Sequence, residues 1–196
     1  MPTILWPIIA FGAQSLVFLY PPVIVFWLII HSNIDYWRKA GKTRAYWTAC
    51  MAWPAIGIPV LYFRDTLFRT RWPAGWWMTA LGLIALILAL RVASHAAQTI
   101  SLGTLVGLPE LEPGKNRQPI LNTGIYARTR NPVYAAHWFI LLAAAALSGY
   151  AANWVLFACD SIFLPLMIRA EEKELVRRYG DEFEAYMRKV PRFFPW

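Results

Sequence analysis

Four long stretches of this chain contain no Asp, Glu, Lys or Arg, and they constrain its fold more than any other feature. They cover residues 1–34, 45–63, 72–90 and 131–159. A helix needs roughly 20 apolar residues to cross the hydrocarbon core of a bilayer, and each stretch meets or approaches that length. A helix on the surface of a soluble protein would instead carry polar residues along its outer face. The pattern predicts an integral membrane protein.

Composition agrees with a membrane location. Apolar residues make up 58% of the chain and charged residues 15%, against roughly 25% charged residues in a typical soluble protein. We interpret the net charge of +8 as basic loops beside the membrane, so no nucleic-acid partner is expected. Cys50 and Cys159 lie inside apolar stretches without the spacing of a metal site, which predicts two buried thiols and no metal.

The expected fold class is all-α, a polytopic membrane helix bundle with about five spans, at 4–30, 45–63, 73–92, 133–148 and 152–168. Pro21 and Pro22 should kink the first span or start a second, shorter helix. The first stretch is too long for a cleaved signal peptide, and no basic residue precedes it. Only residues 148–151 separate the last two spans, which predicts a tight hairpin with two short arms. An amphipathic tail helix should follow and break near Gly180.

The distribution of basic residues predicts the orientation. With the N-terminus outside and the C-terminus in the cytoplasm, sixteen basic residues lie inside, and three, namely Arg64, Arg69 and Arg71, lie outside. Cytoplasmic loops of membrane proteins carry this excess. We expect one integrated membrane domain, in which 1–94 form N-terminal transmembrane helices and 95–196 form a loop, the hairpin and the tail.

Several short motifs follow one another in the C-terminal half. The stretch 124–134 reads Gly-Ile-Tyr-Ala-Arg-Thr-Arg-Asn-Pro-Val-Tyr, 169–175 reads Arg-Ala-Glu-Glu-Lys-Glu-Leu, and 179–186 carries Tyr-Gly ahead of a second tyrosine. With the Val-Pro-Arg at 190–192, this order resembles the isoprenylcysteine carboxyl methyltransferase and phospholipid N-methyltransferase superfamily of membrane enzymes. The resemblance covers about residues 99–194. It implies a methyltransferase that uses S-adenosyl-L-methionine.

The chemistry of these residues suits that cofactor. Pro132 is well placed at the first position of a helix, whose free N–H groups would bind a carboxylate, with Arg130 as a charge partner. Tyr126 and Tyr134 offer aromatic faces to adenine or to the sulfonium. The acids Glu171 and Glu172, expected at the exit of the last span, would bind ribose hydroxyls or the ammonium group.

The resemblance also implies the individual site positions. Cofactor-binding residues carried over in this way are Gln118, Pro119, Ile120, Leu121, Tyr126, Asn131, Pro132, Val133, Tyr134 and Glu171, to which the chemistry adds Glu172. The catalytic candidates are Arg130 and Asn131, although Asn131 replaces the usual histidine of the motif.

The acceptor should be lipidic, because a soluble substrate gives no reason to place a site among membrane spans. Candidate acceptor-binding residues are His137, Asp160 and Arg169, while His137 is also compatible with an ordinary histidine of the bundle. The sequence leaves open O- or N-methylation and the oligomeric state. Alternative functions are a phospholipid amine N-methyltransferase, an NADPH-dependent carbon–carbon double-bond reductase, and a non-catalytic membrane protein.

Overall fold

Ten α-helices and one 3-10 turn make up the regular structure of residues 4–72, 75–116 and 118–193, the part of the chain described by the computed structural model. Arg117, one of the sixteen basic residues counted above, and residue 194, the last residue of the resemblance, lie outside the described residues. The helices are α1 (Trp6–Ser32), α2 (Ile34–Ala40), α3 (Lys42–Tyr62), α4 (Arg64–Leu67), α5 (Trp76–Ala97), α6 (Leu102–Leu105), α7 (Leu108–Leu111), α8 (Pro132–Ser148), α9 (Ala151–Tyr179) and α10 (Asp181–Lys189), and the 3-10 turn η1 is Gly124–Ala127.

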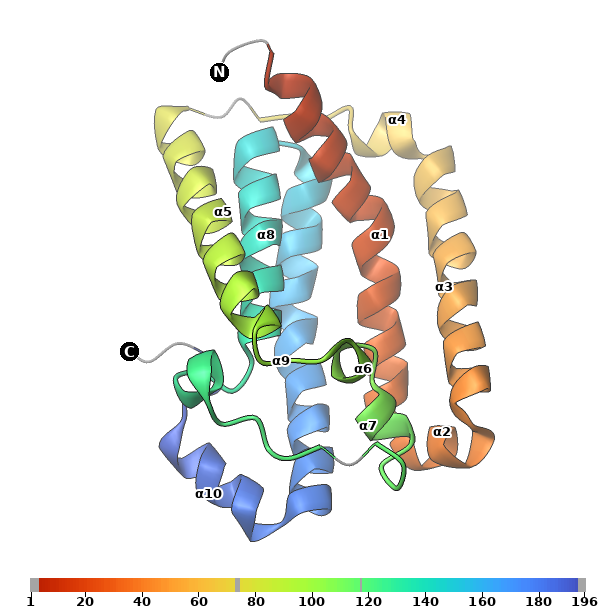
Figure 1. The fold of residues 1–196 in the computed structure, drawn as a ribbon. Coiled ribbons are helices and arrows are strands. Elements are labelled where there is room, and N and C mark those ends of the chain that lie inside the picture. Colours follow the sequence, from red (N-terminus) through yellow and green to blue (C-terminus); the bar gives the residue numbers. More distant parts are fainter. Residues whose placement is uncertain (1–3, 73–74, 117, 194–196) are drawn as a thin grey trace.

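The predicted all-α membrane bundle is confirmed. Five long helices, α1, α3, α5, α8 and α9, run between the two ends of the bundle (Figure 1). Among the described residues, α1, α5 and α9 are long and apolar enough to cross a membrane. The apolar helix α8 is shorter, with 17 residues, and the uncharged part of α3 contains Trp, Tyr and Pro residues, which reduce its mean hydropathy. The number of spans remains a prediction.

The first helix is continuous. Pro21 and Pro22 lie inside α1, which runs through them as one helix of 27 residues. A second, shorter helix therefore does not start at the proline pair, although the sequence allowed for one. The helix changes direction between its first and second halves, in agreement with the kink expected from the proline pair (Figure 1). Val17, Tyr20 and Ile24, on both sides of the prolines, pack against Leu141 of α8 and Leu156 of α9.

The predicted hairpin joins α8 and α9. Gly149 has a φ of 70° and ends α8, and α9 begins at Ala151. Residues 70–72 clamp this turn, since the Trp72 N–H donates to the Gly149 carbonyl and the Ala151 N–H donates to the Thr70 carbonyl. The second arm was predicted too short. Helix α9 has 29 residues, or about 43 Å at 1.5 Å per residue, because its apolar part continues into a charged part without a break.

Small residues allow close packing in the bundle. Helix α5 packs mainly on α8, where Gly82 approaches Leu147 so closely that a Cβ atom would lie 2.6 Å from it. Cys50 and Cys159, predicted to be buried, are instead exposed on the outer surface of the bundle. They behave as small apolar groups on a face that suits lipid.

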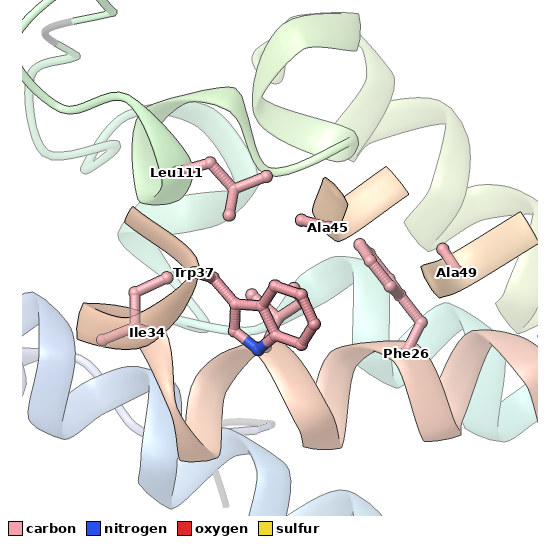
Figure 2. Close-up of a cluster of buried hydrophobic side chains, with 7 residues drawn as sticks. Phe26, Ile34, Trp37, Ala45, Ala49 and Leu111 are labelled. Carbon is pink, nitrogen blue, oxygen red and sulfur yellow. The ribbon is translucent and has the colours of Figure 1, made fainter. Parts of the chain in front are cut away.

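One end of the bundle carries most of the additional structure. Helices α2, α6, α7 and α10 and the turn η1 gather there, away from α4 and the α8–α9 turn (Figure 1). Leu111 of α7 attaches the segment between α5 and α8 to the long helices, because it packs into a cluster of side chains from α1, α2 and α3 (Figure 2). The buried members of this cluster are Phe26, Ile30, Ile34, Trp37, Ala45, Ala49 and Leu111.

The tail breaks at Gly180, as predicted. Gly180 has a φ of 57° and itself occupies the N-cap position of α10. Asp181 is the first residue of α10. Helix α10 does not lie alone on the membrane surface. It buries Phe183, and the Tyr186 hydroxyl donates a hydrogen bond of 2.6 Å to the Tyr126 carbonyl.

Candidate functional site

A cavity lies at the loop-bearing end of the bundle, between α1, α8, α9, α10 and the chain that links α5 to α8. Its volume is about 160 Å³, measured as the space open to the centres of water-sized molecules. The structure brings most of the predicted site residues to this cavity: Gln118, Pro119, Ile120, Leu121, Tyr126, Arg130, Asn131, Pro132, Val133, Tyr134, His137, Glu171 and Glu172 all line it.

The start of α8 opens onto the cavity. Asn131 is the N-cap residue, and its side chain makes no capping hydrogen bond. Pro132 has no N–H, whereas Val133 and Tyr134 belong to the first turn, where N–H groups lack partners within the helix. These two N–H groups and the helix dipole favour an anionic group at this wall, because no side chain competes for them.

Arg130 lies beside the start of α8, as predicted, and its guanidinium is bonded to groups of α9 and α10. Its Nε and Nη2 donate to Glu172 Oε1 at 3.0 and 2.8 Å, and its Nη1 donates to the Met187 and Val190 carbonyls. The guanidinium side chain is only 9% exposed. Through these bonds Arg130 ties the start of α8 to α9 and to the end of α10, and it also lines the cavity.

Glu172 and Asn131 complete the same attachment. Glu172 Oε2 accepts from Arg192 at 2.6 Å, so this acid lies between two arginines. The Asn131 side-chain amide donates to the Arg192 carbonyl at 3.0 Å. Both residues line the cavity, and their side chains also hold residues 190–192 against the start of α8.

Glu171 is placed differently from its neighbour. It lies in the second half of α9 rather than at a solvated helix start. The Tyr134 hydroxyl donates to Glu171 Oε2 at 2.6 Å, and in the described part of the chain no arginine or lysine pairs with this acid. Glu171 therefore keeps the capacity to bind a hydroxyl or ammonium group in the cavity.

The linking chain supplies a wall made largely of backbone. The Gln118 side chain accepts from the Thr104 hydroxyl, and the Gln118 carbonyl accepts from the Tyr179 hydroxyl at 2.7 Å. Residues 119–121 follow without helix or strand. Tyr126 is 7% exposed; burial, and then the charge of Glu171, raise the pKa of its hydroxyl. Burial also raises the pKa of Tyr186 to about 12, so both phenols stay neutral and can donate hydrogen bonds.

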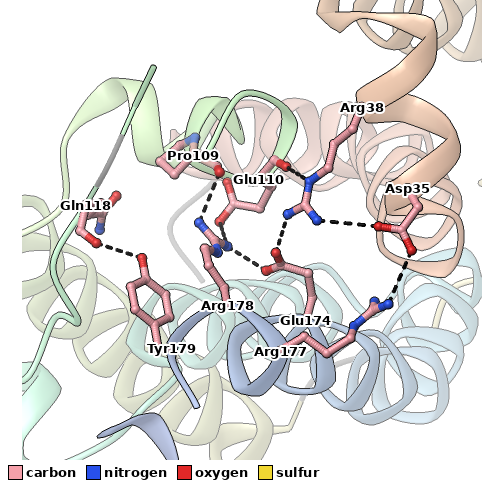
Figure 3. A network of polar contacts seen from close by, with 9 residues as sticks. All are labelled: Asp35, Arg38, Pro109, Glu110, Gln118, Glu174, Arg177, Arg178 and Tyr179. Atoms are coloured by element: carbon pink, nitrogen blue, oxygen red, sulfur yellow. Dashed lines mark hydrogen bonds and ion pairs between the residues drawn. The ribbon is translucent and has the colours of Figure 1, made fainter. Parts of the chain in front are cut away.

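A network of charged side chains closes the cavity beside α7 (Figure 3). Arg178 pairs with Glu174 at 2.5 Å and with Glu110 at 3.4 Å, and Arg38 pairs with Glu174 and donates to the Glu110 carbonyl. Burial, followed by the charge of Glu171, raises the pKa of Glu110. Sequence reasoning missed this network, because its members come from three distant segments with no common motif.

Two of the predicted acceptor-binding residues lie away from the cavity. Asp160 is fully buried in α9 next to Tyr20, behind the cavity wall, and Arg169 is exposed on the outside of α9. His137 does line the cavity, where its ring meets Tyr20 edge-on at 5.6 Å.

Helix α1 contributes side chains that were not predicted. Tyr20, Trp27 and His31 all line the cavity. Their spacing of seven and four residues places them on one face of a helix, which is the signal that could have found them. It was hidden by the general aromatic content of the stretch.

The chain is similar to the protein-S-isoprenylcysteine O-methyltransferase of Schizosaccharomyces pombe, with 28% identity over 159 residues. The aligned region covers 80% of this chain and 61% of that enzyme, so the chain spans less than two thirds of the length of the curated relative it matches. The similarity supports the resemblance to the isoprenylcysteine carboxyl methyltransferase superfamily predicted from the motifs. No protein-family model matches the chain, and no solved structure matches it.

Proposed function

We propose that this protein is a membrane-embedded methyltransferase that uses S-adenosyl-L-methionine to methylate a lipidic acceptor. One observation carries the proposal: the backbone of residues 118–121, Tyr126, the open start of α8 and Glu171, which are far apart in sequence, line one cavity. The similarity to a curated methyltransferase supports the same conclusion.

The donor groups of the cavity fit the chemical groups of this cofactor. The free N–H groups of Val133 and Tyr134 suit its carboxylate. Glu171 suits its ammonium group or ribose hydroxyls, and the apolar and aromatic surface of Ile120, Leu121 and Tyr126 suits adenine. When bound, the cofactor supplies a methyl group already activated by a positively charged sulfur.

The protein then has to orient the acceptor and exclude water. Residues 190–192, held by Arg130, Glu172 and Asn131, pack against the start of α8, which forms one wall of the cavity. Apolar side chains of α1 and α9, among them Ile24 and Met167, line the part that extends into the bundle. This apolar part supports a lipidic acceptor.

The structure offers less support for a reductase that binds NADPH. A 2′-phosphate needs free arginine or lysine side chains. Within the described residues, the arginines that line the cavity are Arg130 and Arg178, and both are paired with acids.

Calorimetry on the full chain in detergent micelles tests the proposal. We expect S-adenosyl-L-methionine and S-adenosylhomocysteine to bind at one site, and NADPH not to bind. As a matched pair, Glu171→Gln should weaken binding, whereas Glu182→Gln, a change to an exposed acid of α10, should have no effect. Binding of NADPH in place of S-adenosyl-L-methionine would reject the proposal.

A further inference from the structure

Helix α9 carries an exposed stripe that changes from apolar to basic along its length. The members of this stripe are exposed side chains that recur every three or four residues, namely Val155, Cys159, Ile162, Leu166, Arg169, Lys173 and Arg177. At about 100° per residue, these positions fall within a sector of roughly 80° around the helix. The apolar and the basic side chains therefore continue one another on a single outer face of α9.

The change from apolar to basic coincides with the expected edge of the hydrocarbon core of a bilayer. Helix α9 is one of the described helices that are long and apolar enough to cross a membrane. Its part from Ala151 to Ile168 is about 27 Å long at 1.5 Å per residue, close to the roughly 30 Å of a hydrocarbon core. Arg169 then lies at the edge of the core, and Lys173, about 6 Å further along the helix, lies in the layer of lipid head groups.

Arg169 and Lys173 are free cations. Within the described residues, neither side chain has a partner in a hydrogen bond or an ion pair. The next basic residue of the stripe differs from them, because Arg177 pairs with Asp35 of α2 at 3.3 Å. Arg177 thus attaches α9 to α2, whereas the two cations closer to the hydrocarbon core have no such role inside the protein.

The acids of this part of α9 lie on other faces of the helix. Glu172 and Glu174 are 5% and 1% exposed, and Glu171 lines the cavity. Charge is therefore separated around the helix, with the acids directed into the protein and the basic side chains directed outward. The stripe presents positive charge to the head-group layer without an acid of its own to neutralise it.

We propose that Arg169 and Lys173 bind the phosphate of an anionic phospholipid whose acyl chain lies along Ile162 and Leu166. Side chains four residues apart on a helix are neighbours, so both cations can reach one phosphate, the arginine through its planar fork and the lysine as a point charge. A zwitterionic lipid would place its own ammonium group beside these cations, so the site favours an anionic head group. This lipid lies on the outer surface of α9, and its binding does not depend on methyl transfer in the cavity.

Native mass spectrometry of the full chain in an uncharged detergent measures the binding. The probes are dioleoyl phosphatidylglycerol and dioleoyl phosphatidylcholine, which have the same acyl chains and differ in head-group charge. We expect wild-type protein to prefer phosphatidylglycerol by about thirtyfold, the contribution of two cations beside an anionic head group. Arg169→Gln or Lys173→Gln alone should reduce the preference by about fivefold, and the two changes together should abolish it.

The matched control removes the same charge elsewhere. Lys115→Gln with Lys189→Gln changes two exposed residues outside α9 and should leave the preference as in wild type. The exchange of Arg169→Lys with Lys173→Arg keeps both charges and should also retain it. An equal loss in the control and in the Arg169→Gln, Lys173→Gln variant would show that net charge attracts the lipid, and would overturn the proposal.

Cys159 allows the lipid to be located on the helix. It is exposed on the same stripe, and Cys50→Ser leaves it as the single thiol of the chain. A fluorescent label on Cys159, in protein reconstituted in nanodiscs, reports contact with lipids that carry bromine on their acyl chains, because bromine quenches fluorescence at short range. We expect stronger quenching by brominated phosphatidylglycerol than by brominated phosphatidylcholine, and equal quenching after Arg169→Gln with Lys173→Gln. Equal quenching with both cations in place would overturn the proposal, as would displacement of phosphatidylglycerol by inorganic phosphate, since the site would then take a soluble anion.

Discussion

At the scale of single residues, Glu171 and Glu172 differ sharply although they are adjacent in the chain. Glu172 lies between the guanidinium groups of Arg130 and Arg192, whereas Glu171 accepts from the Tyr134 hydroxyl and faces His31. Consecutive residues of a helix project about 100° apart, so one acid points to the junction with the C-terminal segment and the other to the cavity. Their substitution should therefore have separable effects.

For this pair we predict loss of stability from one change and loss of binding from the other. Glu172→Gln leaves two arginines without their counter-charge and should lower the free energy of unfolding by on the order of 3 kcal/mol. Glu171→Gln keeps an acceptor for Tyr134, so the fold should persist while affinity for S-adenosyl-L-methionine falls about ten- to a hundred-fold, the value of a hydrogen bond to a charged group. Thermal unfolding and calorimetry measure the two effects. Equal effects of both changes on binding and stability would refute this division.

Arg130 leads to a second prediction. Lysine preserves the charge but not the planar fork, and it cannot reach Glu172 and the carbonyls of Met187 and Val190 together. Arg130→Lys should therefore lower the melting temperature almost as much as Arg130→Ala. Arg44→Lys, at an exposed position of α3, is the control and should change nothing. If lysine fully restores stability at position 130, the network of hydrogen bonds is not what holds the C-terminal segment.

The same residues mark the limit of prediction from sequence at this scale. The motif around Arg130 and Asn131 correctly indicated where the cavity lies. The motif could not predict the hydrogen bonds that Arg130 makes, because its partners include backbone carbonyls some sixty residues away in the chain. Arg169, a predicted acceptor-binding residue, lies on an exposed face of α9.

At the scale of elements, the α8–α9 hairpin is the part against which α1 and α5 pack. Its turn is clamped by Arg71, whose Nε donates to the Ser148 carbonyl at 2.9 Å and whose guanidinium lies over the Trp6 ring. The turn itself was predictable from Gly149 and its short length. The extent of α9 was not, because hydropathy marks where apolar residues end and not where a helix ends.

Gly149→Ala should be strongly destabilising. The backbone there has a φ of 70°, and a Cβ atom would lie 2.1 Å from the Trp72 carbonyl oxygen. The left-handed conformation alone costs roughly 1–2 kcal/mol for a residue with a side chain, and the clash adds to it. Gly12→Ala in α1 is the control, since no atom lies within 4 Å of its Cβ position. Thermal unfolding should show a lower melting temperature for Gly149→Ala and no decrease for Gly12→Ala; equal values would contradict the proposed clamp.

At the scale of the whole molecule, the cavity and most of the ionic network lie at one end of the bundle. Two ionic clusters belong to that end, which also carries α2, α7 and α10 (Figure 1). One consists of Arg38, Glu110, Glu174 and Arg178, and the other of Arg130, Glu172 and Arg192. Arg64, Arg69 and Arg71 belong to the other. The arrangement of loops at opposite ends follows from helices that cross the bundle in alternating directions, which the sequence could predict. The pairing of basic residues with acids across loops could not be predicted, because it depends on how separate helices pack.

The orientation of the molecule in the membrane provides the last prediction. Positively charged loops stay in the cytoplasm, and sixteen of the nineteen basic residues belong to the segments assigned to one side. A reporter fused after Trp196 should therefore read cytoplasmic, and one inserted between Phe68 and Arg69 should read external. Because S-adenosyl-L-methionine is a soluble cytoplasmic compound, the cavity must open to the same side as the tail. An external reading after Trp196 would contradict the orientation and the proposed cofactor together. A cytoplasmic reading at both positions would mean that α5, α8 and α9 do not all cross the membrane.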